Sequence, residues 1–376
     1  MTTGGQLSAA LDGCRIISTA HRRSSELAAA LARHGAAMIA APALTIVPHA
    51  DDDALLVVTR ELIASPPDIV VATTGVGFRG WVEAAHEAGL ADELLGALAD
   101  AQIVARGPKA RGAIQQAGLT ADWVAETETT AELGEYLVAR GVTGLRVAVQ
   151  HHGSGADGLD ELLTEHGADV TSLTVYRWGP PLDAGAVSVS TIAAAGGDAD
   201  AVLFTSAPAA HAWLDAAEKA DALDAIRERA ATNRLLLASV GPITAGPLHR
   251  RDLVTSIAER GRLGSLVRLV VTHFGAGGAP SLTTRSGHLE MRSSGAVLDG
   301  THLPLSPTST SVLSVLFDAG GSVVTRGEIQ GALPGTGLSP HAVDMAVARL
   351  RTGLGDPTLV ATVVKRGYRL DVEDSA

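Results

Sequence analysis

The feature that most constrains this chain is an internal duplication in its first 275 residues. His34-Gly35 ends one helical pattern and His166-Gly167 ends another, 132 residues later. The apolar runs at 68–74 and 200–206 show the same spacing and both end in hydroxyl residues. The front of the chain is therefore expected to fold as two copies of one unit.

Each copy alternates short apolar runs with stretches of helical periodicity, which predicts α/β lobes with parallel sheets covered on both faces. The segment 44–47 leads out of the first layer and 173–176 leads back. The lobes are therefore expected to be interleaved and joined by two crossing strands. Lobe A takes residues 1–42 and 178–275, and lobe B takes residues 48–172.

Ligands of parallel sheets bind outside the carboxyl ends of the strands. In both copies that edge is marked by hydroxyl residues or Gly-Pro loops that open helices, where free N–H groups and the helix dipole favour anions. The candidate ligand-binding residues are Thr74, Arg106, Lys109, Ser206 and Thr244.

Simpler roles exist for several of these features. Thr74, Ser206 and Thr244 could each cap a helix. The motif at 75–80 fits G-x-G-x-x-G, but the following strand ends without the acidic residue that would hold a ribose, so no dinucleotide cofactor is expected. His151-His152 lacks metal-ligand spacing and is interpreted as a surface or loop pair, and no metal site is expected.

Composition narrows the class of protein. The chain has 46% hydrophobic residues, a net charge of -12 and one cysteine, Cys14, which excludes an internal disulfide. Neither a basic leader nor an apolar spanning segment is present in the sequence, so a cytoplasmic protein without membrane contact is expected. The acidic balance lies in residues 1–280, which are not expected to grip nucleic acid.

Residues 343–370 contrast with that acidity. Val343, Val347, Leu350 and Leu354 follow at helical spacing and predict a buried face, and the β-branched run at 360–364 can pair with 368–370 as a hairpin. Residues 349–370 hold five cations and one anion, Asp356, which suits a phosphate backbone. The candidate DNA-binding residues are His341, Met345, Arg349, Arg351, Thr352, Lys365 and Arg366.

The pattern VD-x(4)-RLR-x(2)-LGDP followed by TVVKRGYRL resembles the winged-helix effector domain of OmpR/PhoB-type response regulators. The resemblance runs from about residue 289 to 370 and includes LSPT at 305–308 and VTRGEI at 324–329. It implies a winged helix-turn-helix domain at 285–376 that binds double-stranded DNA, as a dimer on two half-sites. A glycine-rich linker at 276–284 would join it to the lobes.

The duplicated layout resembles uroporphyrinogen-III synthase, with ASVGPITA at 238–245 as the best local match. This resemblance covers about residues 13–275 and implies cofactor-free cyclisation of hydroxymethylbilane. Tyr176 stands where the family has its acid tyrosine, and Thr74, Ser206 and Thr244 resemble its hydroxyl ligands. The sequence departs from the family at Thr19-Ala20-His21, where an arginine is missing, and at Lys109, where a threonine is usual.

The whole arrangement is similar to actinobacterial regulators built from a synthase-like lobe pair and a DNA-binding domain. The expected function is a transcriptional regulator whose synthase-like domain serves ligand sensing or assembly, with a tetrapyrrole or another anionic small molecule as the expected ligand and nitrate or nitrite assimilation genes as targets. The alternatives are an active uroporphyrinogen-III synthase and a non-catalytic tetrapyrrole binder. Tyr176 could equally be a packed structural residue.

Overall fold

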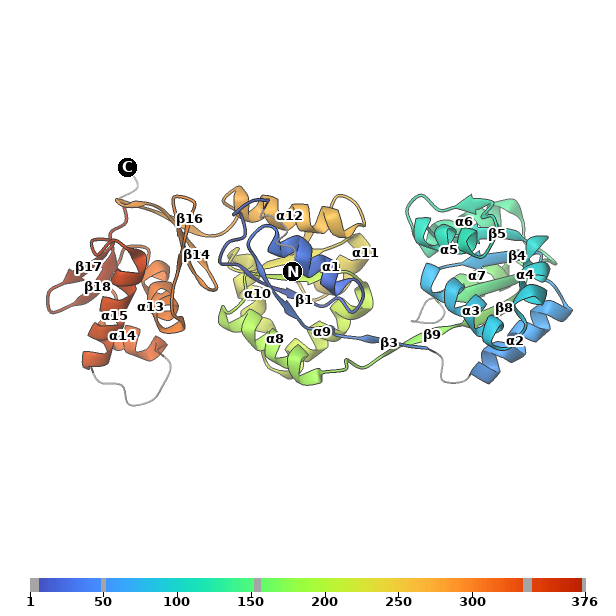
Figure 1. Ribbon diagram of the computed structural model, residues 1–376, viewed down its shortest axis with the longest axis horizontal. Coiled ribbons are helices and arrows are strands. Elements are labelled where there is room, and N and C mark those ends of the chain that lie inside the picture. The colour runs from blue at the N-terminus through green and yellow to red at the C-terminus, as the bar shows by residue number, and fades with distance from the viewer. Residues whose placement is uncertain (1–6, 49–51, 152–156, 334–339, 374–376) are drawn as a thin grey trace. The chain divides into compact units, whose positions relative to one another are not determined.

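The computed structural model describes residues 7–48, 52–151, 157–333 and 340–373. The chain divides into two compact units, Thr45–Pro180 and Met1–Leu44 with Pro181–Ala376. Parallel sheets in both units confirm the predicted α/β class (Figure 1). Among the described residues no helix is both long and apolar enough to cross a membrane.

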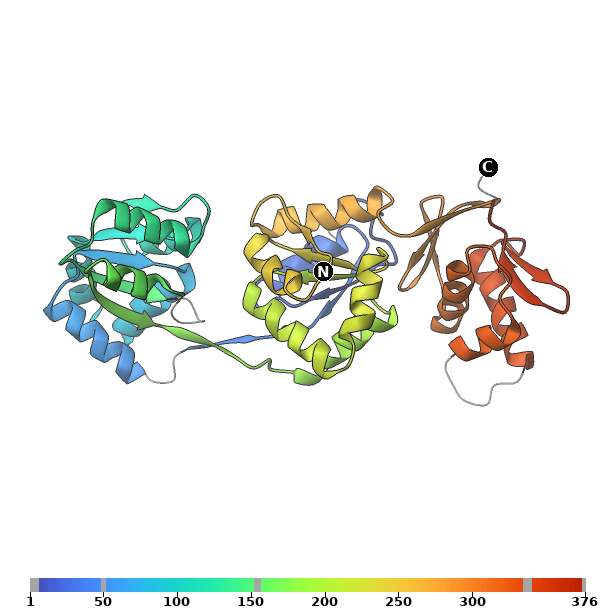
Figure 2. The same ribbon diagram turned by 180° about the vertical axis from the view of Figure 1, so that it is seen from behind.

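Lobe B contains a five-stranded parallel sheet with strand order β6-β5-β4-β7-β8. Helices α2 to α5 cover one face of this sheet and α6 and α7 cover the other (Figures 1 and 2). The strands are β4 (Ile69–Ala72), β5 (Gln102–Ala105), β6 (Trp123–Val124), β7 (Arg146–His151) and β8 (Asp169–Thr174). The helices are α2 (Asp52–Ala64), α3 (Gly75–Glu87), α4 (Ala91–Ala99), α5 (Pro108–Gln116), α6 (Thr130–Arg140) and α7 (Leu159–Glu165).

Lobe A has the matching sheet, in the order β12-β11-β10-β1-β2, again parallel throughout. The strands are β1 (Arg15–Ser18), β2 (Ala37–Ala40), β10 (Ala201–Phe204), β11 (Leu236–Ser239) and β12 (Ser256–Ile257). The helices are α1 (Ser24–Ala32), α8 (Ala184–Gly196), α9 (Ala207–Lys219), α10 (Leu223–Ala231), α11 (Pro242–His249) and α12 (Leu263–Gly275).

The cores of the two lobes share one feature, a buried tryptophan whose indole N–H donates to a hydroxyl oxygen. Trp81 and Trp213 are fully buried. The indole Nε1 of Trp81 donates to Thr59 Oγ1 at 3.0 Å, and that of Trp213 donates to Ser190 Oγ at 2.9 Å. The large ring can therefore be buried without leaving its N–H unpaired.

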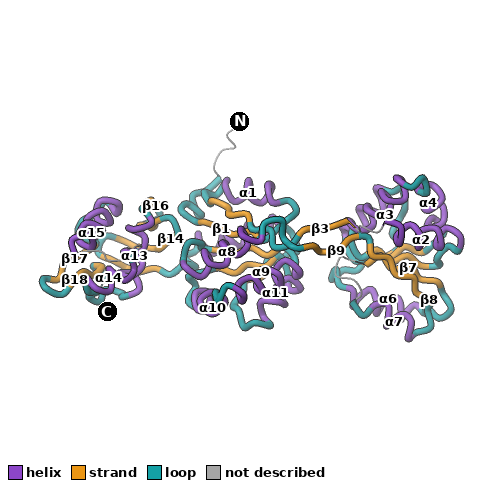
Figure 3. Tube along the Cα trace, turned by 90° about the horizontal axis from the view of Figure 1, so that it is seen from below, coloured by secondary structure: helices purple, strands orange, loops and turns teal. Residues whose placement is uncertain are grey.

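Strands β3 (Thr45–Pro48) and β9 (Tyr176–Gly179) pair antiparallel and lie side by side (Figure 3). The sequence predicted one extended segment at 173–176, whereas the structure has two strands there. Thr174 is the last residue that pairs with β7 in the lobe B sheet, and Tyr176 is the first that pairs with β3. The break at Val175 therefore separates two different pairing partners.

The C-terminal domain begins with an antiparallel sheet, β13 (Ser281–Thr284), β14 (Gly287–Arg292), β15 (Gly295–Leu298) and β16 (Thr301–Pro304). The linker expected at 276–284 is therefore too long, because residues 281–284 pair with β14. Helices α13 (Pro307–Asp318), α14 (Arg326–Ala332) and α15 (Pro340–Leu354) follow. Strands β17 (Val360–Val363) and β18 (Gly367–Leu370) complete the domain and form the hairpin called the wing here.

The face of α15 that was predicted to be buried packs against α13 and α14. Val343, Val347 and Leu350 have no exposed surface and Leu354 has 2%. These side chains join one core with residues of α13, α14 and the wing, which confirms the helical spacing seen in the sequence. Packing of three helices against the wing fixes which face of α15 is left outside.

Candidate functional site

The outer face of α15 carries the side chains that the sequence assigned to DNA binding. His341, Met345, Arg349 and Thr352 are all exposed. Arg349 has no carboxylate within ion-pair distance in the described part of the chain, so its charge is available to a partner. An exposed helix face of this kind, with its opposite face fixed in a core, can enter the major groove of DNA.

The tip of the wing adds two exposed cations, Lys365 and Arg366. Lys365 has a φ of 62°, a left-handed conformation that turns the chain between β17 and β18. Gly367 has a φ of 147°, and a Cβ atom there would lie 1.9 Å from the carbonyl oxygen of Val324. Glycine at 367 therefore lets the wing pair closely with Val324, through the two backbone hydrogen bonds between Val324 and Tyr368 at 2.8 and 2.9 Å.

Arg351 lies differently from the other candidate cations. Its guanidinium donates to the carbonyl oxygen of Val360 at 2.9 and 2.6 Å and to Thr362 Oγ1 at 2.8 Å. It also stacks 5.7 Å from the ring centre of Tyr368. Arg351 therefore ties α15 to the wing, a structural role that its exposed neighbour Arg349 does not have.

A second tie joins α14, α15 and the wing through Asp344, which the sequence analysis did not single out. Its Oδ1 accepts hydrogen bonds from Tyr368 Oη at 2.6 Å and from Arg326 Nε at 2.9 Å. These two bonds, the tyrosine bond foremost, lower the pKa of Asp344. Burial and the Asp344 bond raise the pKa of Tyr368. The network orients the wing relative to α15.

In lobe B the predicted ligand residues gather at the carboxyl ends of β4 and β5. Thr74 caps α3, because its Oγ1 accepts from Gly77 N–H at 3.1 Å. A Cβ atom on Gly75 would lie 2.3 Å from the backbone oxygen of Lys109, so the two loops touch directly. A Cβ atom on Gly77 would lie 2.0 Å from Gln150 Nε2. The two glycines thus allow the close packing of these loops.

Arg106 is the half-buried cation of this edge, and Lys109 is exposed. Burial lowers the pKa of Arg106, while Asp157, Tyr176 and Glu128 partly offset that effect. Tyr176 is 5% exposed, and its ring packs edge-on against Trp178 with the ring centres 5.7 Å apart. Arg106 is thus placed to attract an anion, whereas the Tyr176 side chain is packed in the lobe B core.

In lobe A, Ser206 and Thr244 follow the neighbouring strands β10 and β11. Ser206 caps α9 through a hydrogen bond from Ala209 N–H at 3.4 Å, and so repeats the role of Thr74. Thr244 is 6% exposed in the first turn of α11. The capping role expected as the simpler explanation is therefore observed for Thr74 and Ser206.

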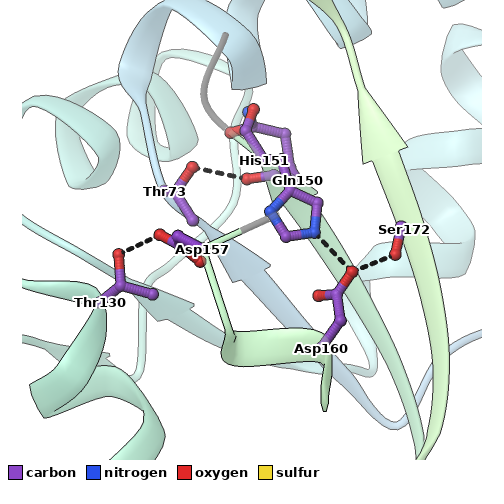
Figure 4. Close-up of polar contacts among 7 residues, drawn as sticks. All are labelled: Thr73, Thr130, Gln150, His151, Asp157, Asp160 and Ser172. Carbon is purple, nitrogen blue, oxygen red and sulfur yellow. Dashed lines mark hydrogen bonds and ion pairs between the residues drawn. The ribbon is translucent and has the colours of Figure 1, made fainter. Parts of the chain in front are cut away.

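His151 was expected in a surface loop, but it is 2% exposed at the end of β7. Its Nε2 lies 2.8 Å from Asp160 Oδ2 on α7, which also accepts a hydrogen bond from Ser172 Oγ on β8 (Figure 4). Burial opposes ionisation of Asp160, yet the hydrogen bonds from His151 and Ser172 leave its pKa below the ordinary value. Residue 152 lies outside the described residues. These hydrogen bonds connect α7 to strands β7 and β8. The three residues lie on three successive elements and meet only in the folded lobe.

The chain has two parallel α/β sheets, the paired strands β3 and β9, and a winged-helix-like domain after them. This combination defines a protein with a two-lobed, synthase-like part and a domain of the DNA-binding winged-helix type. The family model for uroporphyrinogen-III synthase HemD matches residues 25–268, and the model for the C-terminal domain of transcriptional regulatory proteins matches residues 300–370. The chain belongs to the uroporphyrinogen-III synthase HemD family and carries an OmpR/PhoB-type domain at its C-terminal end.

A mutant uroporphyrinogen III synthase from the extremely thermophilic bacterium Thermus thermophilus is 28% identical, with a TM-score of 0.56 over 68% of this chain and 97% of that chain. An uncharacterised protein, YjjA, of Bacillus subtilis strain 168 is 30% identical over 55% of this chain and 77% of its own length. The DNA-binding domain of the response regulator AdeR, solved with an intercistronic region, is 27% identical over 22% of this chain and 93% of that chain, with a TM-score of 0.21.

Proposed function

We propose that this protein is a transcriptional regulator that binds double-stranded DNA through α15 and the wing, and that its lobes sense an anionic small molecule such as a tetrapyrrole. One observation carries the proposal. Arg349, Lys365 and Arg366 are exposed without carboxylate partners in the described part of the chain, on a helix and a hairpin that are braced against each other. Unpaired cations on a fixed frame suit contacts with phosphates and base edges.

A gel shift with a duplex from the protein's own promoter region tests the DNA-binding part. Arg349→Gln and Lys365→Asn should each weaken binding, and asparagine is chosen because it tolerates the left-handed backbone at 365. Arg285→Gln is the matched control, because it removes one positive charge from the same domain at a side chain that is 73% exposed and outside α15 and the wing. Equal, sequence-independent binding by all four proteins would reject the proposal.

The ligand-sensing part is supported by the electrostatics of the lobe B edge. Arg106 is half-buried, and in the described part of the chain no carboxylate lies within ion-pair distance of its guanidinium. An anion beside the first turn of α5 would gain both that charge and free backbone N–H groups. Absorbance titration with uroporphyrin should give a saturable change that Arg106→Gln weakens. No spectral change with the wild type would dismiss a tetrapyrrole as the ligand.

The proposed regulon follows from the chemistry of the family. Siroheme derives from uroporphyrinogen III and serves nitrite reduction, so genes for nitrate or nitrite assimilation are the proposed targets. Sheared genomic DNA retained by the purified protein should be enriched in the regions upstream of those genes. Recovery of other loci in their place would leave DNA binding intact and refute this choice of regulon.

The second candidate function is uroporphyrinogen-III synthase activity, favoured by Tyr176 lying close enough to Arg106 to raise the pKa of its guanidinium. We expect no turnover, because the Tyr176 side chain is buried and a general acid must reach its substrate. Incubation with hydroxymethylbilane followed by separation of isomers I and III decides the point. Isomer III above the level of spontaneous closure, lost in Tyr176→Phe, would establish the enzyme.

A further inference from the structure

The C-terminal domain contacts lobe A directly as well as through the linker. The turn between β14 and β15 packs against the sheet of lobe A. Asp200 accepts hydrogen bonds from Ser293 N–H at 2.8 Å and from Ser293 Oγ. Ser294 Oγ donates to the carbonyl oxygen of Gly13 at 2.8 Å. The Arg292 guanidinium lies 5.0 Å from the ring centre of Phe274 on α12. The contact surface between lobe A and the C-terminal domain is called the seam below.

A cavity of about 430 Å³ opens along the seam. This volume falls within the range of about 300–1,000 Å³ that is typical of small-molecule sites. Lobe A contributes three arginines and two aspartates to its wall, and the C-terminal domain contributes one arginine, one aspartate, and hydroxyl and apolar side chains. Residues that matter for the argument are Arg15, Arg229, Arg234, Phe274, Arg292 and Leu305.

The charges of the wall divide into paired and unpaired groups. Arg234 pairs with Asp318 at 2.5 Å, and Arg292 pairs with Glu290 at 2.6 Å. Arg15 and Arg229 have no carboxylate within ion-pair distance in the described part of the chain. Asp200 is held by Ser293 and by Arg15 N–H, and Asp198 is exposed to water. Two cations therefore face the cavity without a direct counterion.

Arg229 is the less well compensated of these two cations. Its Nη2 donates to the carbonyl oxygen of Arg234 at 2.9 Å, and its Nε is buried without an acceptor among the described residues. Burial lowers the pKa of Arg229, and the nearby Asp200 offsets this only in part. A bound anion would stabilise this half-buried guanidinium, which lacks a hydrogen-bond acceptor at Nε, because charge-assisted bonds to a carboxylate or phosphate are strong.

We propose that the seam cavity binds a small organic anion, with a carboxylate or phosphate on Arg229 and Arg15 and an apolar body of about one ring against Leu305. The ligand contacts lobe A and the C-terminal domain together, so its binding stabilises the seam. The inference deepens the proposed function by adding a second effector site next to the DNA-binding domain. The test of the seam site uses no DNA, so the failure of this proposal can be distinguished from the failure of the proposed DNA binding.

The probe is 4-fluorobenzoate, whose ¹⁹F line is followed during titration with the full chain. We expect saturable broadening with the wild type, about tenfold weaker binding to Arg229→Gln, and weaker binding to Arg15→Gln. The Arg15 variant keeps the backbone N–H that holds Asp200, so it preserves the seam. Competition by inorganic phosphate distinguishes a phosphate from a carboxylate ligand, and either result supports the site.

Arg227→Gln is the matched control, because Arg227 lies on the same helix α10 but pairs with Asp224 and donates to the carbonyl oxygen of Arg251. It should bind the probe like the wild type. Absence of broadening with the wild type would overturn the proposal. Equal broadening in Arg229→Gln and Arg15→Gln, or with neutral 4-fluorobenzyl alcohol, would overturn it too.

Discussion

Asp200 and Asp68 hold the same position in the two lobes, but only Asp200 is covered by another domain. The carboxylate of Asp200 accepts from Arg15 N–H at 2.8 Å, and that of Asp68 accepts from Arg146 N–H at the same distance. Asp200 is 8% exposed beneath Ser293, whereas the Asp68 side chain is 40% exposed. Asp68 therefore serves as an internal control for the contribution of the seam contact at Asp200 to stability.

Asp200→Asn should destabilise the protein more than Asp68→Asn. The amide nitrogen of asparagine cannot accept the N–H bonds that both Asp200 oxygens receive, and a buried unsatisfied group costs about 1–3 kcal/mol. At Asp68, water can replace the lost bond. Chemical unfolding of both variants measures the difference, and equal losses would show that Ser293 does not hold the seam.

Arg351→Gln and Arg349→Gln should separate structure from recognition. Loss of Arg351 removes the hydrogen bonds to Val360 and Thr362, so the melting temperature of the C-terminal domain should fall together with DNA affinity. Loss of Arg349 should reduce DNA affinity alone. Calorimetry and DNA titration of both variants check this, and an unchanged melting temperature in Arg351→Gln would contradict the structural role.

Gly367→Ala should disrupt the pairing of the wing with Val324 and so weaken DNA binding. The added Cβ would overlap the carbonyl oxygen of Val324, and a residue forced into such a backbone conformation costs about 1–3 kcal/mol. Gly331→Ala on α14 is the control, since a Cβ there meets nothing within 4 Å. Hydrogen exchange of the amides in β17 and β18 reports the effect, and protection equal to that of the wild type would refute it.

Asp344 should make the C-terminal domain sensitive to acid. Hydrogen bonds from Tyr368 and Arg326 hold its pKa below the ordinary aspartate value, so the ionised group stabilises the folded state at any pH above that value. This contribution is lost as the pH falls through the lowered pKa. The difference in melting temperature between wild type and Asp344→Asn should therefore be largest near neutral pH and shrink below about pH 4. A difference that does not vary with pH would contradict the assignment.

The sequence predicted what depends on local periodicity and on repetition. Helical spacing at Val343 and Leu350 identified the buried face of α15, and the 132-residue repeat identified the two parallel sheets. The hairpin of β15 and β16 was not predicted, although Asp299-Gly300 between the two strands is a strong turn signal.

Contacts between distant segments could not be predicted. His151 meets Asp160 only after α7 packs on β7, and Asp344 meets Tyr368 only when the wing folds back. Asp200 and Ser293 are 93 residues apart, and no pattern in either segment indicates the other. The seam cavity lies at that contact, so no local sequence pattern indicates that its arginines line one site.

The salt dependence of DNA binding by the full chain tests the central claim most directly. Fluorescence anisotropy on a promoter duplex gives the slope of log affinity against log salt concentration for wild type, Arg349→Gln and Arg285→Gln. Loss of one phosphate contact lowers this slope by about 1. The account predicts that decrease for Arg349→Gln and the wild-type slope for Arg285→Gln. Identical slopes for all three proteins would contradict it.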